Sequence, residues 1–354
     1  MLALRWHGRR DVRLEEVETP EAAPPGGLLL GVEWCGICGT DREEYESGPH
    51  NIPVGSPHPL TGRAAPVVLG HEVAGRVIEV GEGVEDFEAG QVVGVEGTVS
   101  CGACPSCRHG LANLCPKRAN VGFAYDGGLA ERMVVPASAC LALPPGLGPL
   151  GGALAEPLSV AVRALRRSGA ALGDSAVVVG AGTIGLFVLQ LLRLAGLRRV
   201  VVLEPAPTAR ELAASLGAAE VRPGWDVGLE GLPPSPVSFE CSGTTAGLAA
   251  ALEATAAGGR VVLVGVPKGS LDVWTKLVHS ELTLVSSLSH LREDDYLTAL
   301  GLLEHGAVCY EELVAAHLAL RDAWKVFASP CGPPLVAPEV RGTKIVVTPE
   351  TGRA

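Results

Sequence analysis

The chain has 354 residues, is 47% hydrophobic and carries a formal net charge of −11. At roughly 100–200 residues per domain, this length predicts two domains. The acidic balance argues against binding to nucleic acid, because nucleic-acid-binding proteins carry basic faces. No uninterrupted apolar run reaches the about 18 residues of a membrane span, and the first residues lack the apolar core of a secretory signal. We therefore expect a cytoplasmic protein with no membrane partner.

The first cysteines follow a short β-rich region. Residues 12–17 alternate in polarity and residues 28–34 are almost all apolar, so both predict strands. The second strand leads into Cys35-x-x-Cys38, a spacing also found in redox sites. A redox pair would stand before a helix of a βαβ unit, whereas this pair stands among strand and turn residues. We therefore interpret Cys38 as a metal ligand and Cys35 as a buried structural thiol.

Thr40 and Asp41 come directly after this cysteine. A hydroxyl group two residues past a zinc ligand, such as that of Thr40, can hydrogen-bond a substrate alcohol and pass on its proton. An acidic side chain there, such as that of Asp41, can hydrogen-bond a residue that binds the metal and so hold it in place. Either residue can also cap a helix over 42–47. The long Pro- and Gly-rich loop at 49–66 then predicts a wall of the substrate pocket, with His50 and His58 as ordinary loop histidines.

A histidine, a cysteine and a glutamate from distant segments predict the catalytic metal centre. His71 stands between Gly70 and Glu72, and Glu156 precedes Pro157 far downstream. A thiolate, an imidazole and a carboxylate are the three protein ligands of an open zinc site, whose fourth position is left for water or substrate. Cys38, His71 and Glu156 form this set, and Glu72 is either a fourth ligand or a neighbour of the ligands.

Four closely spaced cysteines predict a second metal site, in a lobe over about 98–118. Four thiolates can enclose one tetrahedral zinc completely, which makes the site structural. An iron–sulfur cluster is the alternative, but the spacing is not that of a ferredoxin. The cluster consists of Cys101, Cys104, Cys107 and Cys115, and the remaining solitary cysteines are Cys140, Cys241, Cys309 and Cys331.

The second half of the chain predicts a dinucleotide site. After an apolar helix from 154 to about 168, a strand at 175–179 leads into a G-x-G-x-x-G turn, a helix at 184–195 and a strand at 199–203 that ends in an acid. This order lets backbone N–H groups approach a pyrophosphate, and the acid would bind the adenosine ribose and repel a 2′-phosphate. We therefore expect NAD bound by Gly180, Gly182, Thr183, Ile184, Gly185 and Glu204.

Three more strands, at 237–240, 260–266 and 282–286, would complete the sheet. The nicotinamide half should lie where the second of them ends, at Val264, Gly265 and Val266. No full crossover helix fits between 221 and 236. The tail predicts helices at 294–304 and 320–328 and a strand at 343–347, which we expect to return to the first domain.

These residues resemble the zinc-dependent medium-chain dehydrogenase/reductase family over essentially the whole chain. The match rests on Gly70-His71-Glu72-x2-Gly75-x5-Gly81-x2-Val84, on the four-cysteine lobe and on the Gly180–Gly185 turn. The resemblance implies an α/β fold: a GroES-like β-barrel catalytic domain over 1–156 and 293–354, and a Rossmann doubly wound parallel-sheet cofactor domain over 157–292. It also implies one catalytic zinc, one structural zinc, NAD, and a homo-oligomer, either a dimer or a tetramer.

Within this family, Glu156-Pro157-Leu158 resembles the polyol-dehydrogenase branch, in which a glutamate replaces a cysteine ligand. The loops at 45–62 and 202–205 are most similar to those of the (R,R)-butanediol dehydrogenases. The implied reaction is hydride transfer between NAD and a secondary alcohol or vicinal diol. Sorbitol, L-threonine and glucose dehydrogenase activities are alternatives, and a non-catalytic nucleotide-binding zinc protein is the alternative from another class.

The chain departs from the family after the Thr-Asp pair. Relatives often carry a histidine there as the outer group of a proton relay, whereas this chain reads Arg42-Glu43-Glu44. Either Glu43 or Glu44 takes the proton, or the route runs through cofactor ribose and water.

Overall fold

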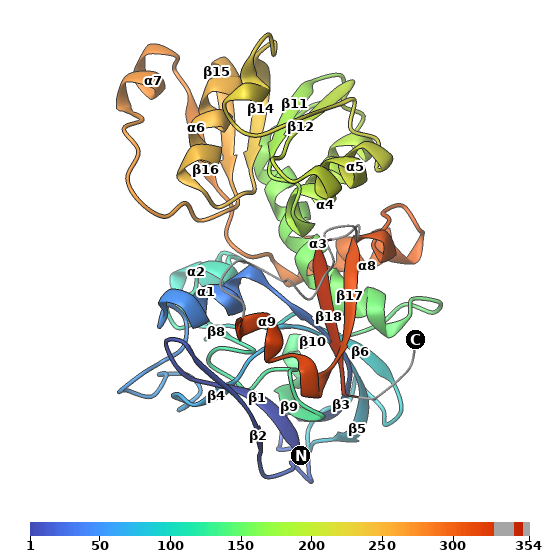
Figure 1. Ribbon diagram of the computed structural model, residues 1–354. Coiled ribbons are helices and arrows are strands. Elements are labelled where there is room, and N and C mark those ends of the chain that lie inside the picture. The colour runs from blue at the N-terminus through green and yellow to red at the C-terminus, as the bar shows by residue number, and fades with distance from the viewer. Residues whose placement is uncertain (329–342, 350–354) are drawn as a thin grey trace. The chain divides into compact units, whose positions relative to one another are not determined.

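The computed structural model describes residues 1–328 and 343–349 (Figure 1). The chain folds into two compact units. The first holds Met1–Glu156 and the described residues from Val314 onward, except Thr343, and the second holds Pro157–Leu313 with Thr343. The end of the second unit was expected at 292. Residues 293–313 also lie in the second unit, where Asp295 forms an ion pair with Arg166 and Gln190 exchanges two hydrogen bonds with the backbone of Cys309.

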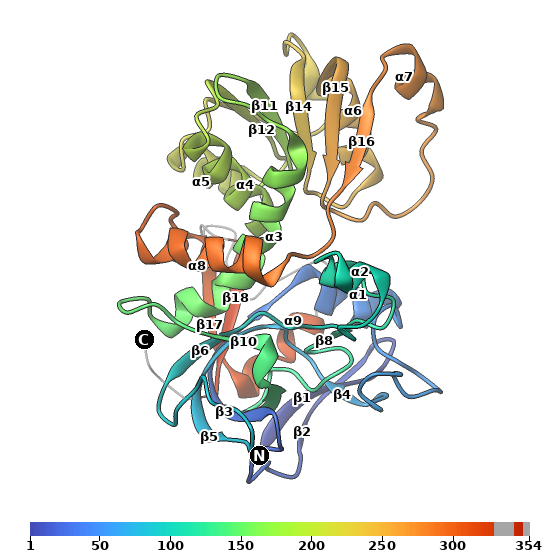
Figure 2. The same cartoon turned by 180° about the vertical axis from the view of Figure 1, so that it is seen from behind.

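The first unit is built mainly from antiparallel strands. Its largest sheet has the order β10-β6-β5-β3-β18-β17, with β9 paired to β3, and a second sheet has the order β2-β1-β4. Figure 2 shows β3 and β5, the most extensively paired strands of this unit. The strands are β1 (Leu2–Gly8), β2 (Asp11–Glu16), β3 (Gly27–Ile37), β4 (Val67–Val68), β5 (Glu72–Val80), β6 (Val92–Val95), β7 (Thr98–Val99), β8 (Ala119–Asn120), β9 (Arg132–Pro136), β10 (Cys140–Ala142), β17 (Val314–Ala319) and β18 (Lys344–Thr348).

The C-terminal segment of the chain completes the first unit's core. Val326, Phe327, Ile345 and Val347 are buried in the same cluster as Leu28, Leu30 and Val32 of β3. The described residues from β17 onward, except Thr343, therefore pack in the first unit. The helical segments of this unit are α1 (Gly39–Ser47), α2 (Pro105–Arg108), α9 (Lys325–Ala328) and the 3₁₀ turns at Ala112–Leu114, Ala137–Ala139 and Leu320–Asp322.

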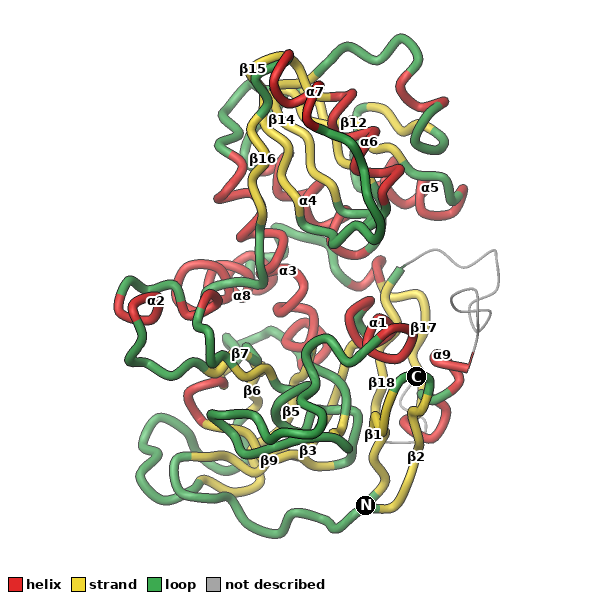
Figure 3. The backbone as a smooth tube through the Cα atoms, turned by 90° about the vertical axis from the view of Figure 1, so that its left-hand side faces the viewer, coloured by secondary structure: helices red, strands yellow, loops and turns green. Residues whose placement is uncertain are grey.

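The second unit is a six-stranded parallel sheet with the order β13-β12-β11-β14-β15-β16. This is the order of a doubly wound nucleotide-binding sheet, in which ligands bind at the carboxyl ends of the strands. In Figure 3, β14, β15 and β16 run side by side as expected from their register. The strands are β11 (Ser175–Val179), β12 (Arg199–Leu203), β13 (Glu220–Arg222), β14 (Ser235–Glu240), β15 (Thr255–Leu263) and β16 (Thr283–Ser286).

Two helices differ in extent from the sequence expectation. The helix that contains Glu156 and Pro157 begins at Pro149 and so starts earlier than predicted, while the helix expected from 294 starts as a π-helical turn at Arg292–Tyr296. As predicted, no full helix joins β13 to β14; a 3₁₀ turn at Val227–Leu229 replaces it. α3 (Pro149–Ser168) runs from the first unit into the second. The other helices of the second unit are α4 (Thr183–Leu194), α5 (Pro207–Ser215), α6 (Thr245–Ala254), α7 (Trp274–His279) and α8 (Leu297–Glu304), and a further 3₁₀ turn lies at Glu311–Leu313.

None of the helices in the described part of the chain combines the length and apolar character that crossing a bilayer would require.

Candidate functional site

Cys38 stands at the junction between a buried strand and a helix. It follows β3 and is the N-cap residue of α1, with φ −92° and ψ 158°. The expectation that Thr40 or Asp41 caps this helix is wrong, because the helix begins at Gly39, three residues earlier than the expected start at 42. Asp41 instead occupies the third helical position, where its Oδ2 accepts a hydrogen bond from the Cys38 N–H at 2.9 Å. Thr40 Oγ1 lies 3.7 Å from Cys38 Sγ.

Asp41 also faces the predicted histidine ligand. Its Oδ1 lies 3.5 Å from Nδ1 of His71, and within the described residues both atoms are buried without another hydrogen-bond partner. Burial opposes protonation of His71, but the Asp41 carboxylate and the Cys38 sulfur outweigh it and raise the pKa of the ring well above its ordinary value. A carboxylate at Nδ1 fixes the ring orientation and leaves the other ring nitrogen for a metal.

Glu72 forms a buried ion pair that the sequence did not predict. Lys344 Nζ donates to Oε1 of Glu72 at 2.6 Å and to Oε2 at 2.7 Å, and the Glu72 side chain is fully buried. Burial lowers the pKa of Lys344, but the Glu72 charge and then that of Cys38 outweigh it, so the net shift is upward. The pair forms because β18 lies antiparallel beside β3, a pairing between segments some 300 residues apart.

Gly36 lies close against this pair. A Cβ at Gly36 would lie 1.9 Å from Oε2 of Glu72, so any other residue would force the carboxylate to shift. Glu72, Gly36 and Lys344 belong to three adjacent strands, β5, β3 and β18.

Cys38, His71 and Glu72 together form a group that could hold a metal ion. Their ligand atoms all lie within 4.8 Å of one another. Sulfur, imidazole nitrogen and carboxylate oxygen are all zinc donors, and the buried histidine with a carboxylate behind it is the usual arrangement at a zinc ligand. The residues therefore fit zinc. Glu156 is not a member of this group, but its charge contributes to the raised pKa of Lys344, so its carboxylate faces the same region.

Cys35 has the properties of a structural thiol. It is fully buried and free, and burial raises the pKa of its sulfur well above the ordinary value. A Cβ on Gly70 would lie 2.5 Å from this sulfur, so Cys35 fills space behind the histidine loop.

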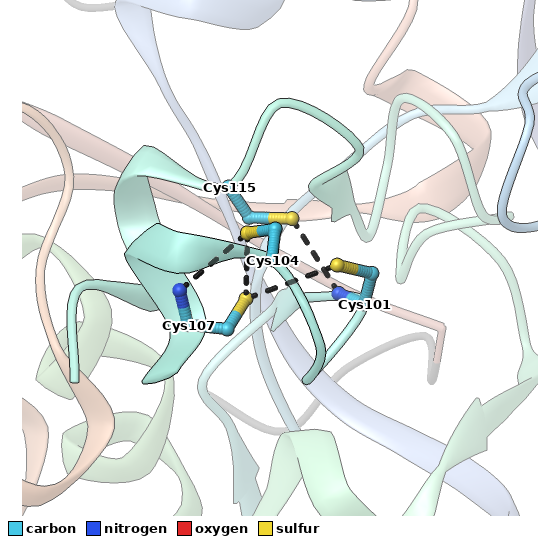
Figure 4. Close-up of side chains that lie close together, drawn as sticks. All are labelled: Cys101, Cys104, Cys107 and Cys115. Atoms are coloured by element: carbon cyan, nitrogen blue, oxygen red, sulfur yellow. Dashed lines mark hydrogen bonds between the residues drawn. The ribbon is translucent and has the colours of Figure 1, made fainter. Parts of the chain in front are cut away.

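The four clustered cysteines point toward one another (Figure 4). Their sulfur atoms lie within 4.8 Å of one another, and the Sγ–Sγ distances from Cys107 are 3.4 Å to Cys104 and 4.0 Å to Cys101. Ligands about 2.3 Å from a tetrahedral zinc are about 3.8 Å apart, so the residues fit this metal as well. Backbone N–H groups of Ala103 and Cys104 lower the pKa of Cys101 to about 6, whereas burial raises that of Cys115 to about 11.

Glu44 is unsuited to the outer proton-relay role considered from the sequence. Its carboxylate is fully buried and accepts hydrogen bonds from the backbone of His50 and from both the backbone and the side chain of Asn51. It is therefore an anchor that fixes the loop after α1.

The glycine-rich turn of the second unit has the shape expected for a phosphate cradle. Gly180 has φ +100°, and a Cβ on Gly185 would lie 1.9 Å from the Gly180 carbonyl oxygen, so both positions need glycine. A Cβ on Gly182, in contrast, would meet no atom within 4 Å. This open space lies at the N-terminus of α4, which Thr183 and Ile184 begin. A helix N-terminus with exposed backbone N–H groups fits a pyrophosphate.

Glu204 lies directly behind this turn, after β12. Its Oε2 accepts a hydrogen bond from the Ala181 N–H at 2.7 Å, and its Oε1 accepts one from Ala206 at 2.8 Å. The carboxylate is thus tied to the residue between the first two glycines, and it lies after the second strand of the sheet, where the ribose-binding acid of a dinucleotide fold is found.

Glu240 is a buried acid at the carboxyl end of β14, and its hydrogen bonds join this strand to the end of β15. This role was not predicted from the sequence. Its backbone oxygen accepts the N–H groups of Val264 and Gly265, and its Oε1 accepts those of Ser242 and Gly243. Burial raises the pKa of this carboxyl group. The sequence feature that could have predicted the role of Glu240 is its place at the end of a strand, just before a turn that contains Ser242 and Gly243. Val266, the next predicted cofactor residue, is 72% exposed.

The chain matches two protein-family models. Residues 24–145 match the alcohol dehydrogenase GroES-like domain, and residues 183–305 match the zinc-binding dehydrogenase domain. The chain is 36% identical over 330 residues to (R,R)-butanediol dehydrogenase of Bacillus subtilis (strain 168), covering 91% of this chain and 93% of that protein.

Solved structures give the same relationship. The crystal structure of 2R,3R-butanediol dehydrogenase from Bacillus subtilis superposes with a TM-score of 0.87 at 35% identity, covering 99% of each chain. A zinc-binding dehydrogenase from Sinorhizobium meliloti 1021 bound to NADP has a TM-score of 0.86 at 30% identity, covering 98% of this chain and 99% of that one. The predicted combination of a GroES-like domain and a Rossmann domain is confirmed, and the chain belongs to the zinc-dependent medium-chain dehydrogenase/reductase family.

Proposed function

We propose that this protein is a butanediol dehydrogenase-like enzyme, which transfers hydride between NAD and a secondary alcohol, preferably a vicinal diol. The observation that carries the proposal is the buried group of Cys38, His71 and Glu72, whose ligand atoms lie within 4.8 Å of one another, in a chain that also has an open glycine turn. In the oxidation direction the substrate carbon loses hydride to the nicotinamide, and its hydroxyl group loses a proton.

The residues of the metal group would have separate roles. Cys38 and His71 would hold zinc, which as a Lewis acid eases loss of the hydroxyl proton at neutral pH. Asp41 would keep the histidine ring in the ligating orientation. Thr40, whose Oγ1 lies 3.7 Å from Cys38 Sγ, would accept the substrate proton and release it toward solvent.

Two acids near the metal would differ in function. Lys344 compensates the charge of Glu72. We therefore assign Glu72 one of two roles: it lies next to the metal ligands without binding the metal, or it is a weak fourth ligand. Glu156 would be the third protein ligand. A carboxylate that the two hydroxyl groups of a diol can replace favours vicinal diols or ketols over simple alcohols.

We also propose a second, structural zinc at Cys101, Cys104, Cys107 and Cys115, and a preference for NAD over NADP. The four converging thiols support the first, and the carboxylate of Glu204 at the turn supports the second, because it would repel a 2′-phosphate. A homodimer or homotetramer in the cytoplasm is the proposed state. The free cysteines fit a reducing compartment.

An NAD-reduction panel tests the assignment. We expect turnover of 2,3-butanediol stereoisomers above that of sorbitol, L-threonine and glucose. In Cys38→Ala or His71→Ala, turnover should be lost while NAD affinity stays near normal, and Cys309→Ala, an exposed thiol outside the group, should behave as wild type. Intact turnover in either ligand variant would contradict the metal site.

The alternative of a non-catalytic nucleotide-binding protein makes a different prediction. Such a protein would bind NAD equally well as wild type and as the Cys38 and His71 variants, and none of these proteins would reduce NAD with any alcohol of the panel. The retention of Thr40 beside Cys38 argues against this alternative, because a protein without turnover does not need a proton acceptor at this place.

A further inference from the structure

Glu240 is a buried carboxylate of the second unit that has hydrogen bonds but no cationic partner. It ends β14, and its side chain is fully buried. Oε1 accepts the Ser242 N–H at 2.8 Å, the Ser242 hydroxyl at 2.5 Å and the Gly243 N–H at 3.1 Å. Within residues 1–328 and 343–349, no lysine, arginine or histidine forms an ion pair with it. Such donors stabilise the ionised group without cancelling its net charge, although burial outweighs them and raises its pKa.

The same residue ties together the turns that follow β14 and β15. Its side chain holds the first turn through Ser242 and Gly243. Its backbone oxygen holds the second turn, because it accepts the N–H groups of Val264 and Gly265, both at 3.0 Å. A Cβ on Gly265 would lie 2.7 Å from Oε2 of Glu240, so the second turn lies directly against the carboxylate. Glu240 therefore fixes the position of both turns.

These two turns lie beside the glycine-rich turn. Cys241 donates its N–H to the carbonyl oxygen of Val179, and a Cβ on Gly180 would lie 2.9 Å from the Ser242 nitrogen. Because β11 lies between β12 and β14, this is the switch point of the sheet, where a dinucleotide binds. The half of the sheet with Glu204 serves the adenosine, and the half that begins with β14 serves the nicotinamide.

We infer that Glu240 positions the turns around the nicotinamide half of the cofactor and that its charge raises the affinity for NAD⁺ relative to NADH. The nicotinamide ring is cationic in NAD⁺ and neutral in NADH, so a negative charge attracts only the oxidised ring. The carboxylate need not contact the ring, because the protein interior screens a buried charge less than water does. The inference rests on the proposed function and deepens it, since it assigns a residue that distinguishes oxidised from reduced cofactor.

Binding of both cofactor forms tests this inference without turnover. The Kd of NADH follows from its fluorescence and that of NAD⁺ from titration calorimetry, both on zinc-loaded protein. In Glu240→Gln the ratio of the NAD⁺ Kd to the NADH Kd should rise at least about threefold over wild type, because the attraction to the cationic ring is lost. The Kd of ADP-ribose, which lacks the ring, should change by less than about twofold.

Two further variants separate the charge from the hydrogen bonds. Ser242→Ala removes one hydrogen bond to the carboxylate but keeps the charge, so the ratio should stay within about twofold of wild type while both Kd values rise together. Glu253→Gln is the matched control for loss of a glutamate charge: this residue of α6 pairs with Lys276 at the surface, and both Kd values should stay at the wild-type level.

Thermal unfolding of each protein without cofactor shows whether the fold is intact. Glu240→Ser is the second neutral variant, because its smaller side chain leaves room for water to accept the freed N–H groups. It takes the place of Glu240→Gln if that variant does not unfold cooperatively, and the same rise in the ratio is expected.

A rise below about threefold in the folded neutral variant would overturn the inference, and so would an equal rise in Ser242→Ala or Glu253→Gln. Failure of the proposed function is a separate result. If the wild type oxidises no alcohol of the panel, the proposed function fails, but the ratio still decides the role of Glu240. If the wild type turns over and the ratio does not move, only this inference fails, and a wild type that binds neither cofactor form refutes both.

Discussion

Replacing Lys344 with methionine should destabilise the first unit strongly. The ammonium group is the counter-charge of the Glu72 carboxylate, at 2.6 and 2.7 Å, and the two side chains are 5% and 0% exposed. Removing one partner of a buried ion pair leaves an uncompensated charge and costs about 3–5 kcal/mol. In a folding unit of 150–250 residues each kcal/mol lowers Tm by about 2–4 °C, so the expected decrease is roughly 6–20 °C.

The assay is thermal or urea unfolding of three variants, each measured with wild-type zinc loading. Glu72→Gln in the Lys344→Met background should recover at least half of the loss, because the unpaired charge is then absent. Lys325→Met is the control: this lysine forms a 2.6 Å ion pair with Asp322 at the surface, and such pairs contribute only about 0–1 kcal/mol. A loss below about 1 kcal/mol in Lys344→Met, or no recovery in the double variant, would refute the reasoning.

Four further outcomes are expected. Asp41→Asn should weaken zinc binding about 10- to 100-fold in metal competition, because the carboxylate orients His71; unchanged affinity would contradict this. Cys107→Ser should leave one zinc per chain by elemental analysis and lower Tm, and two retained zinc ions would refute the structural site. Glu204→Ala should raise KM for NAD at least about tenfold but not that for NADP, and parallel increases would argue against ribose binding. Gly36→Ala should cost about 1–3 kcal/mol in urea unfolding, because its Cβ would overlap the Glu72 carboxylate, and a neutral effect would show that this carboxylate can move.

Local patterns carried most of the fold prediction. The strand–turn–helix pattern around Gly180 predicted the nucleotide sheet because each parallel strand and its turn are encoded within some thirty consecutive residues. The four-cysteine lobe could likewise be predicted, since its ligands lie within fifteen residues and their sulfur atoms converge.

Partners that are distant in sequence could not be predicted in this way. Lys344 begins an otherwise apolar strand, and only the pairing of β18 with β3 brings it to Glu72. The same limitation applies to Glu44, which the sequence offered with Glu43 as a possible proton acceptor but which is buried and hydrogen-bonded by the loop after α1. In both cases the burial of a charged group decides its role, and burial depends on the tertiary fold.

The buried acids of the first unit bear on the proposed metal site, because their partners decide how much negative charge a cation there would meet. Glu44 accepts hydrogen bonds from backbone and amide donors, Lys344 compensates the charge of Glu72, and Asp41 accepts a backbone N–H and faces the histidine ring. Each of these acids therefore has its own partner within the protein and does not depend on the metal for compensation. A zinc ion at Cys38 and His71 would then be balanced chiefly by the thiolate of Cys38 and by the carboxylate of Glu72 or Glu156. Part of the charge of the ion would remain available to polarise a substrate hydroxyl group.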